Sequence, residues 1–385
     1  MNRNDLILVG LGGGGSRLVD SIVNNDPRFA SYYINTSITD IEALETADKN
    51  TKNYFCISTN NGVGRNRDLG KSFAKKSGYS IIDIIERFNQ DVIYFVSSLG
   101  GGSGSALLSE LLRAIETLKS DPDSDFNKII NIIGILPDLK SPTVILKNAR
   151  DTWNEIMNWT CVNSMIFVNN NCKLDENYDS ADEKEIRINE MFSEYFSSIF
   201  DIPVINGVNF DNGNLTNILT DKGCLYFYDL PNDCSSIEVA MSKSENNSIL
   251  GRMYIDDNSI TITDDNKKLI NCSYLGISFI NEDYNKNYIF NKYLPKTEPY
   301  VGENAERNLL LISGCLPPLN DMKIIDLELK EREKNIENEN TMNFSNLILN
   351  KDNNNTKANT EKNEPIKEKK EGKKKVIKKV KKGLF

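Results

Sequence analysis

The sequence predicts an α/β protein with a mostly parallel sheet, a smaller α+β domain and a basic tail. Short apolar runs alternate with amphipathic stretches through the first half of the 385 residues, as in sheets covered by helices on both faces. Glycine-rich turns follow two of these runs. After residue 223 the pattern changes to strand-like runs with fewer helices between them.

Six apolar runs in the first half are predicted to be buried strands. They are short, rich in β-branched or aromatic residues, and bounded by Gly, Asn or Pro. They cover residues 6–9, 32–34, 54–57, 92–96, 129–136 and 165–168. Apolar residues at helical spacing predict helices around residues 18–22, 81–88, 107–115 and 145–156.

A long amphipathic pattern over residues 183–200, which ends at Asp201-Ile202-Pro203, predicts a helix that links two domains. Strand-like runs then follow at residues 224–228, 259–263, 274–280 and 309–313. We therefore expect five parts: a first domain at 1–182, the long helix and its following loop at 183–222, a second domain at 223–319, a surface helix at 320–340, and a disordered basic tail at 341–385.

The composition excludes several classes of enzyme. The chain has no histidine, so it lacks a Ser-His-Asp triad, a Cys-His pair and an HExxH zinc helix. Its seven cysteines include no CxxC pair, which argues against a zinc site. No apolar run reaches eighteen residues, and the first is too short for a signal sequence. We expect a cytoplasmic protein with reduced thiols and no membrane partner.

The last 35 residues differ in charge from the rest of the chain. Residues 351–385 hold 13 lysines against 5 acidic residues, a net charge of +8, while residues 1–350 have a net charge of -17. Because neighbouring lysines repel one another, this tail is expected to stay solvated and free for a partner. Its apolar residues recur at helical spacing, which would suit docking on an acidic protein surface, anionic lipid or nucleic acid.

Two glycine-rich loops each lie between a predicted strand and a predicted helix. They are Gly10-Leu11-Gly12-Gly13-Gly14-Gly15-Ser16 and Ser97-Ser98-Leu99-Gly100-Gly101-Gly102-Ser103-Gly104-Ser105. Glycines let backbone N–H groups approach a phosphate, and a helix N-terminus adds a favourable dipole. Two such loops on one sheet could hold a single polyphosphate, whereas a dinucleotide fold needs only one. The chain contains no GxxxxGK[ST] phosphate loop.

The second loop resembles the GGGTGS or GGGTGT signature of the tubulin/FtsZ superfamily, and the resemblance runs in order from residue 5 to about 220. It implies GTP or GDP as ligand, together with Mg²⁺, whose protein ligands the sequence leaves unknown. The GTP contacts that it implies are Gly12, Gly13, Gly14, Gly15, Ser16, Arg17, Asn35, Gly64, Arg65, Asn66, Gly100, Gly101, Gly102, Ser103, Gly104, Ser105, Asn170, and either Asn189 or Glu190.

Some positions depart from the family pattern. Arg17 stands where FtsZ proteins typically carry Asn, and residues 138–146 offer no clear match for the Glu and Arg that contact the ribose in FtsZ. On the central helix, the sequence does not separate Asn189 from Glu190 as the contact to the base. Guanine as the base is therefore implied by the family alone.

The segment Asn209-Phe210-Asp211-Asn212-Gly213-Asn214-Leu215 resembles the family's N-x-D-x-x-[DE] loop. In that family the loop enters the nucleotide site of the next subunit, and its acids orient the attacking water. Asp211 matches the first acid. Asn214 replaces the second, and its amide could hold water but could not accept a proton. An ordinary turn without chemistry would explain the same residues.

Within the superfamily the basic tail is similar to that of the TubZ branch, whose tail engages a DNA-bound adaptor. The resemblance implies an assembly-activated GTPase that forms head-to-tail filaments and segregates plasmid or phage DNA through such an adaptor, without touching the DNA itself. One alternative is an FtsZ-like division or phage-positioning GTPase. Another is a dinucleotide-dependent oxidoreductase, which would need an acid at the end of the second strand, where Ile34-Asn35-Thr36 has none.

Overall fold

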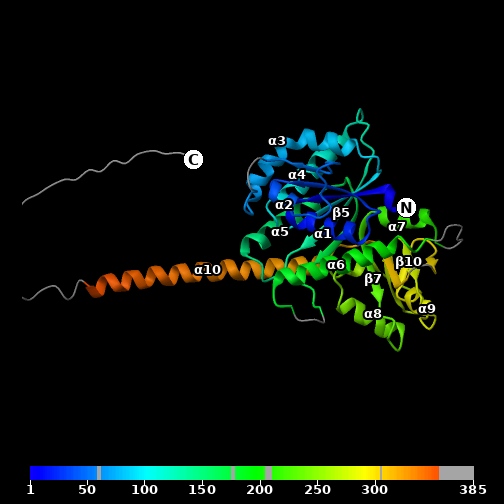
Figure 1. The fold of residues 1–385 in the computed structure, drawn as a ribbon. Helices are drawn as coiled ribbons and strands as arrows, with labels where there is room; N and C mark the ends of the chain where they lie inside the picture. The colour runs from blue at the N-terminus through cyan, green and yellow to red at the C-terminus, as the bar shows by residue number, and fades with distance from the viewer. Residues whose placement is uncertain (59–61, 175–177, 204–209, 304–305, 355–385) are drawn as a thin grey trace, which may run out of the picture. The chain divides into compact units, whose positions relative to one another are not determined.

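The computed structural model describes residues 1–58, 62–174, 178–203, 210–303 and 306–354, and for residues 337–354 the backbone alone. Residues 1–332 form one compact unit, and residues 333–385 belong to a second. The functional residues that the structure describes all lie in the first unit (Figure 1).

A sheet of ten strands forms the centre of the described part of residues 1–332, in the order β12-β10-β13-β7-β6-β5-β4-β1-β2-β3. Neighbouring strands from β7 to β3 are parallel, whereas β13 is antiparallel to both β7 and β10. The strands are β1 (Leu6–Leu11), β2 (Ala30–Asn35), β3 (Tyr54–Cys56), β4 (Val92–Ser98), β5 (Ile129–Leu136), β6 (Val162–Asn169), β7 (Gly223–Leu230), β10 (Leu275–Ser278), β12 (Tyr300–Gly302) and β13 (Asn308–Cys315).

A second, three-stranded sheet joins β8 (Ile260–Ile262), β9 (Lys268–Cys272) and β11 (Tyr293–Pro295). The helices are α1 (Gly12–Asn25), α2 (Ile38–Glu42), α3 (Arg67–Glu86), α4 (Ser103–Ser120), α5 (Thr143–Ile156), α6 (Ala181–Ile199), α7 (Asn212–Thr220), α8 (Ile237–Asn246), α9 (Lys286–Phe290) and α10 (Leu319–Asn354).

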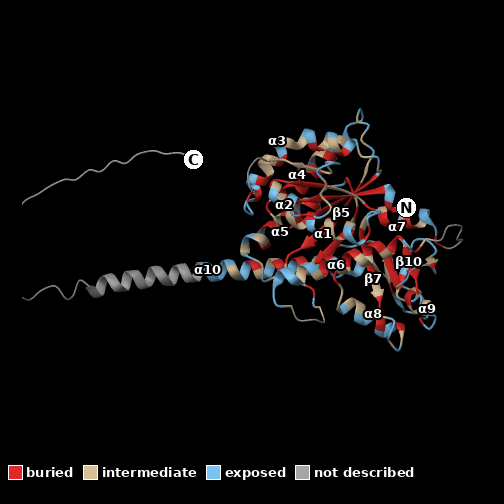
Figure 2. Ribbon diagram, viewed as in Figure 1, coloured by how far each residue is buried: buried red, intermediate tan, exposed pale blue. Residues whose placement is uncertain are grey.

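Helices cover both faces of the large sheet. One hydrophobic core contains buried residues of α3, α4 and α5, such as Ile81, Leu107 and Leu146. The other contains residues of α1 and α6, such as Leu18 and Phe192. Figure 1 shows the strands between α3 and α4 on one side and α1 and α6 on the other. Figure 2 shows the strands of the sheet as buried and the outer helix faces as exposed. The predicted α/β class is therefore confirmed.

The six strands predicted in the first half are all present, and the helix predicted at residues 183–200 is α6. Four strands from residues 223–319 extend the large sheet, and the three-stranded sheet lies within the same range. The sheet thus continues past the expected start of a second domain, and the proposed division into domains stays a prediction.

Helix α10 begins at Leu319, close to the expected start at residue 320, but runs to Asn354 instead of ending at 340. The backbone of residues 341–354, which the sequence predicts to be disordered, is helical. This segment holds Met342, Leu347 and Leu349, which are good helix formers, although its several Asn residues are weaker ones. The rest of the predicted tail, residues 355–385, lies outside the described residues.

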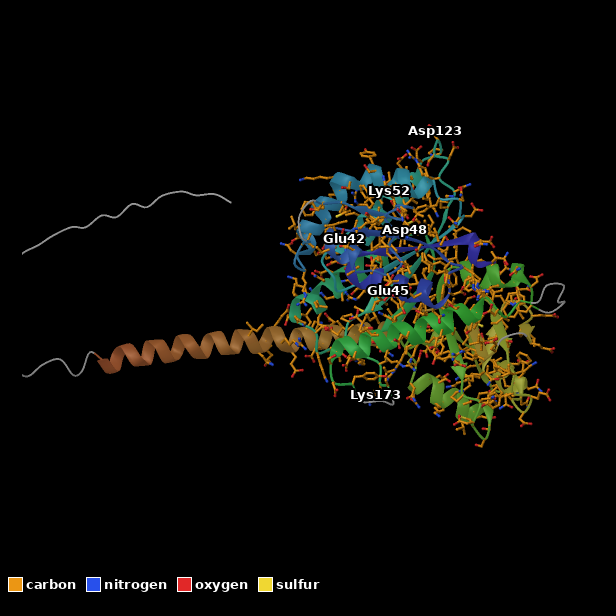
Figure 3. All side chains as sticks on the ribbon, in the orientation of Figure 1. Glu42, Glu45, Asp48, Lys52, Asp123 and Lys173 are labelled. Carbon is orange, nitrogen blue, oxygen red and sulfur yellow. The ribbon has the colours of Figure 1, made fainter. Side chains whose placement is uncertain are left out.

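Charged residues recur along the segment between β2 and β3. Figure 3 labels Glu42, Glu45 and Asp48 together with Lys52 in the segment around β2 and β3, and the two glutamates and the lysine are exposed.

None of the seven cysteines is in a disulfide. Among the described helices, none is both long enough and apolar enough to cross a bilayer.

Candidate nucleotide-binding site

The predicted phosphate and base loops all follow parallel strands of the large sheet. They come after β1, β2, β3, β4 and β6. Because the carboxyl ends of parallel strands meet at one edge, the fold gathers these loops there, where open α/β sheets bind their ligands.

The two glycine loops interlock at this edge. Gly12 has a φ of +66°, and a Cβ built on it would lie 2.5 Å from the backbone nitrogen of Gly104. A Cβ on Gly104 would lie 2.3 Å from the carbonyl oxygen of Leu11. Only glycine fits at either position, so the sequence brings the beginnings of α1 and α4 together.

The first turns of α1 and α4 are open to an anion. Their N-cap residues, Leu11 and Gly102, supply no side-chain cap. The initial N–H groups of a helix have no partner within it, and the helix dipole places positive potential on them. Two uncapped N-termini beside glycine-rich backbone make a suitable cradle for a polyphosphate.

The loop before α3 completes this cradle. A Cβ on Gly102 would lie 2.7 Å from backbone atoms of Arg65, so the two loops are in direct contact. Gly64 and Arg65 have φ values of 56° and 67°, and both are exposed. Asn66, which the resemblance implies as a GTP contact, accepts a 3.0 Å hydrogen bond from the backbone N–H of Leu69 and so caps α3.

Asn35 lies at the end of β2 and is buried. Its Oδ1 accepts a 2.7 Å hydrogen bond from the N–H of Thr36, whose hydroxyl lies 2.6 Å from that of Ser103 at the start of α4. Its Nδ2 donates to Oδ2 of Asp40 at 3.3 Å. Asn35 therefore orders the loop after β2 against the second glycine loop.

Sequence reasoning missed Asp40. Its Oδ2 lies 3.7 Å from the position of a Cβ on Gly13, so a carboxylate stands beside the first glycine loop. Nη1 of Arg17 lies 3.6 Å from the same position, so a guanidinium also stands beside this loop. Mg²⁺ between Asp40 and bound phosphates would be a second cation there. The described residues hold no cluster of three or more acidic or cysteine ligands. Mg²⁺ would thus take most of its ligands from phosphates and water, as it commonly does. An acid five residues after a strand is too weak a signal to be found by motif.

The opposite side of the cradle carries two asparagines with unsatisfied oxygens. Asn170 follows β6 and Asn189 lies on α6, and the Oδ1 atom of each is buried without a hydrogen-bond partner. Lys184 donates to the carbonyl oxygen of Asn170 at 2.7 Å and lies 3.1 Å from Oδ2 of Asp138, which holds this loop to α6. Two buried acceptors without donors suit the donor edge of guanine.

The structure separates Asn189 from its neighbour on α6. Asn189 is 5% exposed, whereas Glu190 is exposed and lies 3.3 Å from Arg187. The arrangement favours Asn189 as the residue facing the base. The hydroxyl of Ser16 on α1 is a third buried group without a partner.

Arg17 lies on the exposed side of α1. Its Nη2 lies 3.0 Å from Oε1 of Glu185, which precedes Asn189 by one turn of α6. This ion pair joins the first glycine loop to the helix that carries the expected base contact.

Asp211 and Asn214 do not join this group. Asp211 is the N-cap of α7, where its Oδ1 accepts from the N–H of Asn214 and the Oδ1 of Asn214 accepts from the N–H of Asp211, both at 2.8 Å. The terminal ammonium of Met1, before β1, donates to the carbonyl of Asn212. Asp211 therefore lies near the amino end of β1, at the opposite edge of the sheet. Asn209, the first residue of the motif, lies outside the described residues.

Comparisons with known proteins point to the same family as the glycine loops. Residues 5–179 match the model of the Tubulin/FtsZ family, GTPase domain. The chain is 24% identical over 338 residues to a tubulin-like protein TubZ from Clostridium botulinum C phage, covering 86% of this chain and 85% of that protein. These findings favour the tubulin/FtsZ hypothesis over the dinucleotide-dependent oxidoreductase.

Solved structures give the same fold. A Clostridium botulinum phage c-st TubZ with a truncated C-terminal tail has a TM-score of 0.72 at 23% identity, covering 86% of this chain and 99% of that chain. A GTPγS-form protofilament of TubZ from Bacillus thuringiensis serovar israelensis has a TM-score of 0.65 at 15% identity, covering 88% and 94%.

Proposed function

We propose that this chain, whose residues 5–179 match the model of the Tubulin/FtsZ family, GTPase domain, binds and hydrolyses GTP within a head-to-tail filament. The observation that carries this proposal is the separation of the two halves of the active site. The glycine loops follow the carboxyl ends of the parallel strands, whereas Asp211 lies beside Met1 at the amino end of β1. The six residues of β1 span roughly 20 Å between these two ends. A carboxylate at that distance does not contact a nucleotide in the same chain, which supports its supply by a second copy.

Within this proposal the N-termini of α1 and α4 bind the phosphates, and Asn170 and Asn189 bind guanine. Bound Mg²⁺ would neutralise phosphate charge next to Asp40. Asp211 of the following copy orients the attacking water, and the amide of Asn214 helps to hold it. Because the nucleotide end and the Asp211 end are different surfaces, each new contact leaves another of the same kind open. Such an interface extends into a filament instead of closing as a dimer.

The decisive measurement is phosphate release per subunit as a function of protein concentration. We expect this specific activity to rise with concentration, and we expect electron microscopy to show filaments with GTP. An Asp211→Asn variant should bind GTP normally, hydrolyse it about tenfold more slowly or worse, and form filaments that persist. A specific activity that stays constant on dilution would show that one chain holds a complete site.

We further propose that the filament acts in the cytoplasm and moves plasmid or phage DNA through a DNA-bound adaptor that binds the lysine-rich tail. The excess of 13 lysines over 5 acids in residues 351–385 supports an acidic protein surface as the partner. The 23%-identical TubZ structure with a truncated tail supports a body that folds without this segment.

Deletion of residues 355–385 should preserve GTP-dependent filaments and remove their association with adaptor-bound DNA. Leu384→Ala with Phe385→Ala should weaken the same contact if the apolar stripe of the tail docks. A tail peptide that shifts bare duplex DNA strongly at physiological salt, and ignores both substitutions, would contradict an adaptor and indicate direct DNA binding.

A further inference from the structure

One face of α5 carries a line of polar side chains that the proposed chemistry does not use. Asn148, Thr152 and Glu155 are spaced at i, i+4 and i+7, so they lie on the same side of the helix. Asn148 and Thr152 bond to loops of the phosphate cradle, and Glu155 pairs with residues at the start of α3. The face therefore contacts two loops that are far apart in the sequence.

Asn148 makes the central contact. Its Nδ2 donates to the carbonyl oxygen of Arg65 at 3.1 Å and to that of Gly100 at 3.3 Å. The side chain is 6% exposed, so both bonds are shielded from water. One amide thus fastens the loop before α3 to the second glycine loop.

The loop that Asn148 holds has an unusual backbone. Arg65 has a φ of 67°, a left-handed conformation that residues other than glycine adopt only when their surroundings fix it. The bond from Asn148 to the Arg65 carbonyl and the contact between Arg65 and Gly102 are two such constraints. Without the Asn148 amide, the Arg65 turn would lose one of these two restraints. This turn belongs to the loop before α3, which contacts the second glycine loop.

Thr152 and Glu155, the other two polar residues on this face of α5, contact the second glycine loop and the start of α3. Thr152 bonds the carbonyl of Leu99 in the glycine loop at 3.1 Å and makes no such bond to the Arg65 turn. Glu155 pairs with Arg67 at 2.6 Å and with Lys71 at 2.7 Å, both in the first turns of α3. Of the side chains on this face, Asn148 joins the two loops directly.

We propose that Asn148 is a positioning residue that sets the Arg65 turn against the second glycine loop so that the γ-phosphate of GTP is recognised. This inference rests on the proposed function, in which the cradle binds GTP. The Arg65 turn lies beside Gly102, where α4 begins, so a terminal phosphate on that helix would meet it. In this arrangement the diphosphate of GDP would end before the turn, so its binding should not depend on Asn148.

The test compares Asn148→Ala with Thr152→Val, both of which remove a buried bond to the second glycine loop. Affinities for GTP and GDP are measured by competition with a fluorescent nucleotide, at protein concentrations too low for assembly. Asn148→Ala should weaken GTP binding about fivefold, the cost of one typical hydrogen bond, and change GDP binding by less than about twofold. Thr152→Val should affect both nucleotides equally.

Hydrogen exchange measures whether the Arg65 turn responds to the third phosphate. A residue that only stabilised the fold would not change the difference in exchange between the GTP and GDP complexes. In the wild-type protein, GTP should slow exchange in the peptide containing Arg65 and Asn66 more than GDP does, and Asn148→Ala should remove this difference. If Asn148→Ala does not fold, Asn148→Ser, which retains one short donor, should show a smaller loss of the same kind.

Equal weakening of GTP and GDP by Asn148→Ala, or no weakening of either, would overturn the inference while leaving the proposed function intact. A wild-type protein that binds neither nucleotide would instead overturn the proposed function. The two failures are therefore distinguishable in one set of titrations.

Discussion

The unsatisfied oxygen of Asn189 leads to a prediction about both stability and base selection. Its Oδ1 is buried and has no hydrogen-bond donor in the described protein. A buried acceptor without a partner costs about 1 to 3 kcal/mol, which a bound guanine would recover through its 2-amino group. Asn189→Leu replaces the amide by an apolar side chain of similar size and removes the cost together with the contact.

The variant should therefore be more stable and less selective. We expect the nucleotide-free variant to gain up to about 1 kcal/mol, or roughly 2 °C in melting temperature for a domain of this size. Inosine triphosphate retains N1–H but lacks the 2-amino group, so wild-type protein should prefer GTP over it by roughly 5- to 150-fold. In Asn189→Leu this preference should fall to within about twofold.

The measurement is a pair of competition titrations with GTP and inosine triphosphate, accompanied by thermal melts without nucleotide. Glu190→Gln is the matched control, because Glu190 is the adjacent but exposed residue on α6 and should leave the preference unchanged. Loss of preference in Glu190→Gln, or a lower melting temperature with unchanged preference in Asn189→Leu, would refute the reasoning and make Asn189 a structural residue.

Three further predictions concern other parts of the molecule. Asp211→Ala removes the cap of α7 and should cost about 1 kcal/mol in urea melts, whereas Asp211→Asn keeps a capping side chain and should cost only a few tenths, although both should hydrolyse GTP slowly. Asn214→Asp should retain or raise GTP turnover and Asn214→Ala should lose much of it, so an unchanged rate in the alanine variant would leave Asn214 as a turn residue. Burial would raise the pKa of Glu155, but hydrogen bonds from Arg67 and Lys71 outweigh it and lower the pKa to about 2. A lowered pKa in the folded state adds stability above the unfolded pKa near 4.5, so this contribution should decline as pH falls from about 4.5 toward 2, and acid melts of Glu155→Gln should lack that component.

The sequence predicted the parallel sheet and the glycine loops because both depend on local patterns. Buried strands need continuous apolar runs, and close backbone approach, as between Gly12 and Gly104, needs glycine. Both patterns can be recognised from the neighbouring residues alone, without knowledge of which loops come into contact in the fold. The predicted strands and the central helix accordingly appear in the structure with small differences in their bounds.

Side chains that act across loops could not be found in this way. Asp40 and Asn148 reach the cradle from α2 and α5, and nothing in their neighbouring residues indicates which carbonyl or carboxylate they will meet. Asn189 and Glu190 are adjacent in sequence but differ by about 100° around the helix axis. Only the packing of α6 decides which of them is buried.

The distance between Asp211 and the cradle has a consequence for the two tips of the proposed filament. At one tip the last subunit would present its nucleotide to solvent, with no neighbour to supply a carboxylate. That nucleotide would stay intact for as long as the subunit remained terminal. At the other tip the last Asp211 would face water. The two tips would therefore differ in nucleotide state, because each arriving subunit would start hydrolysis in the subunit before it.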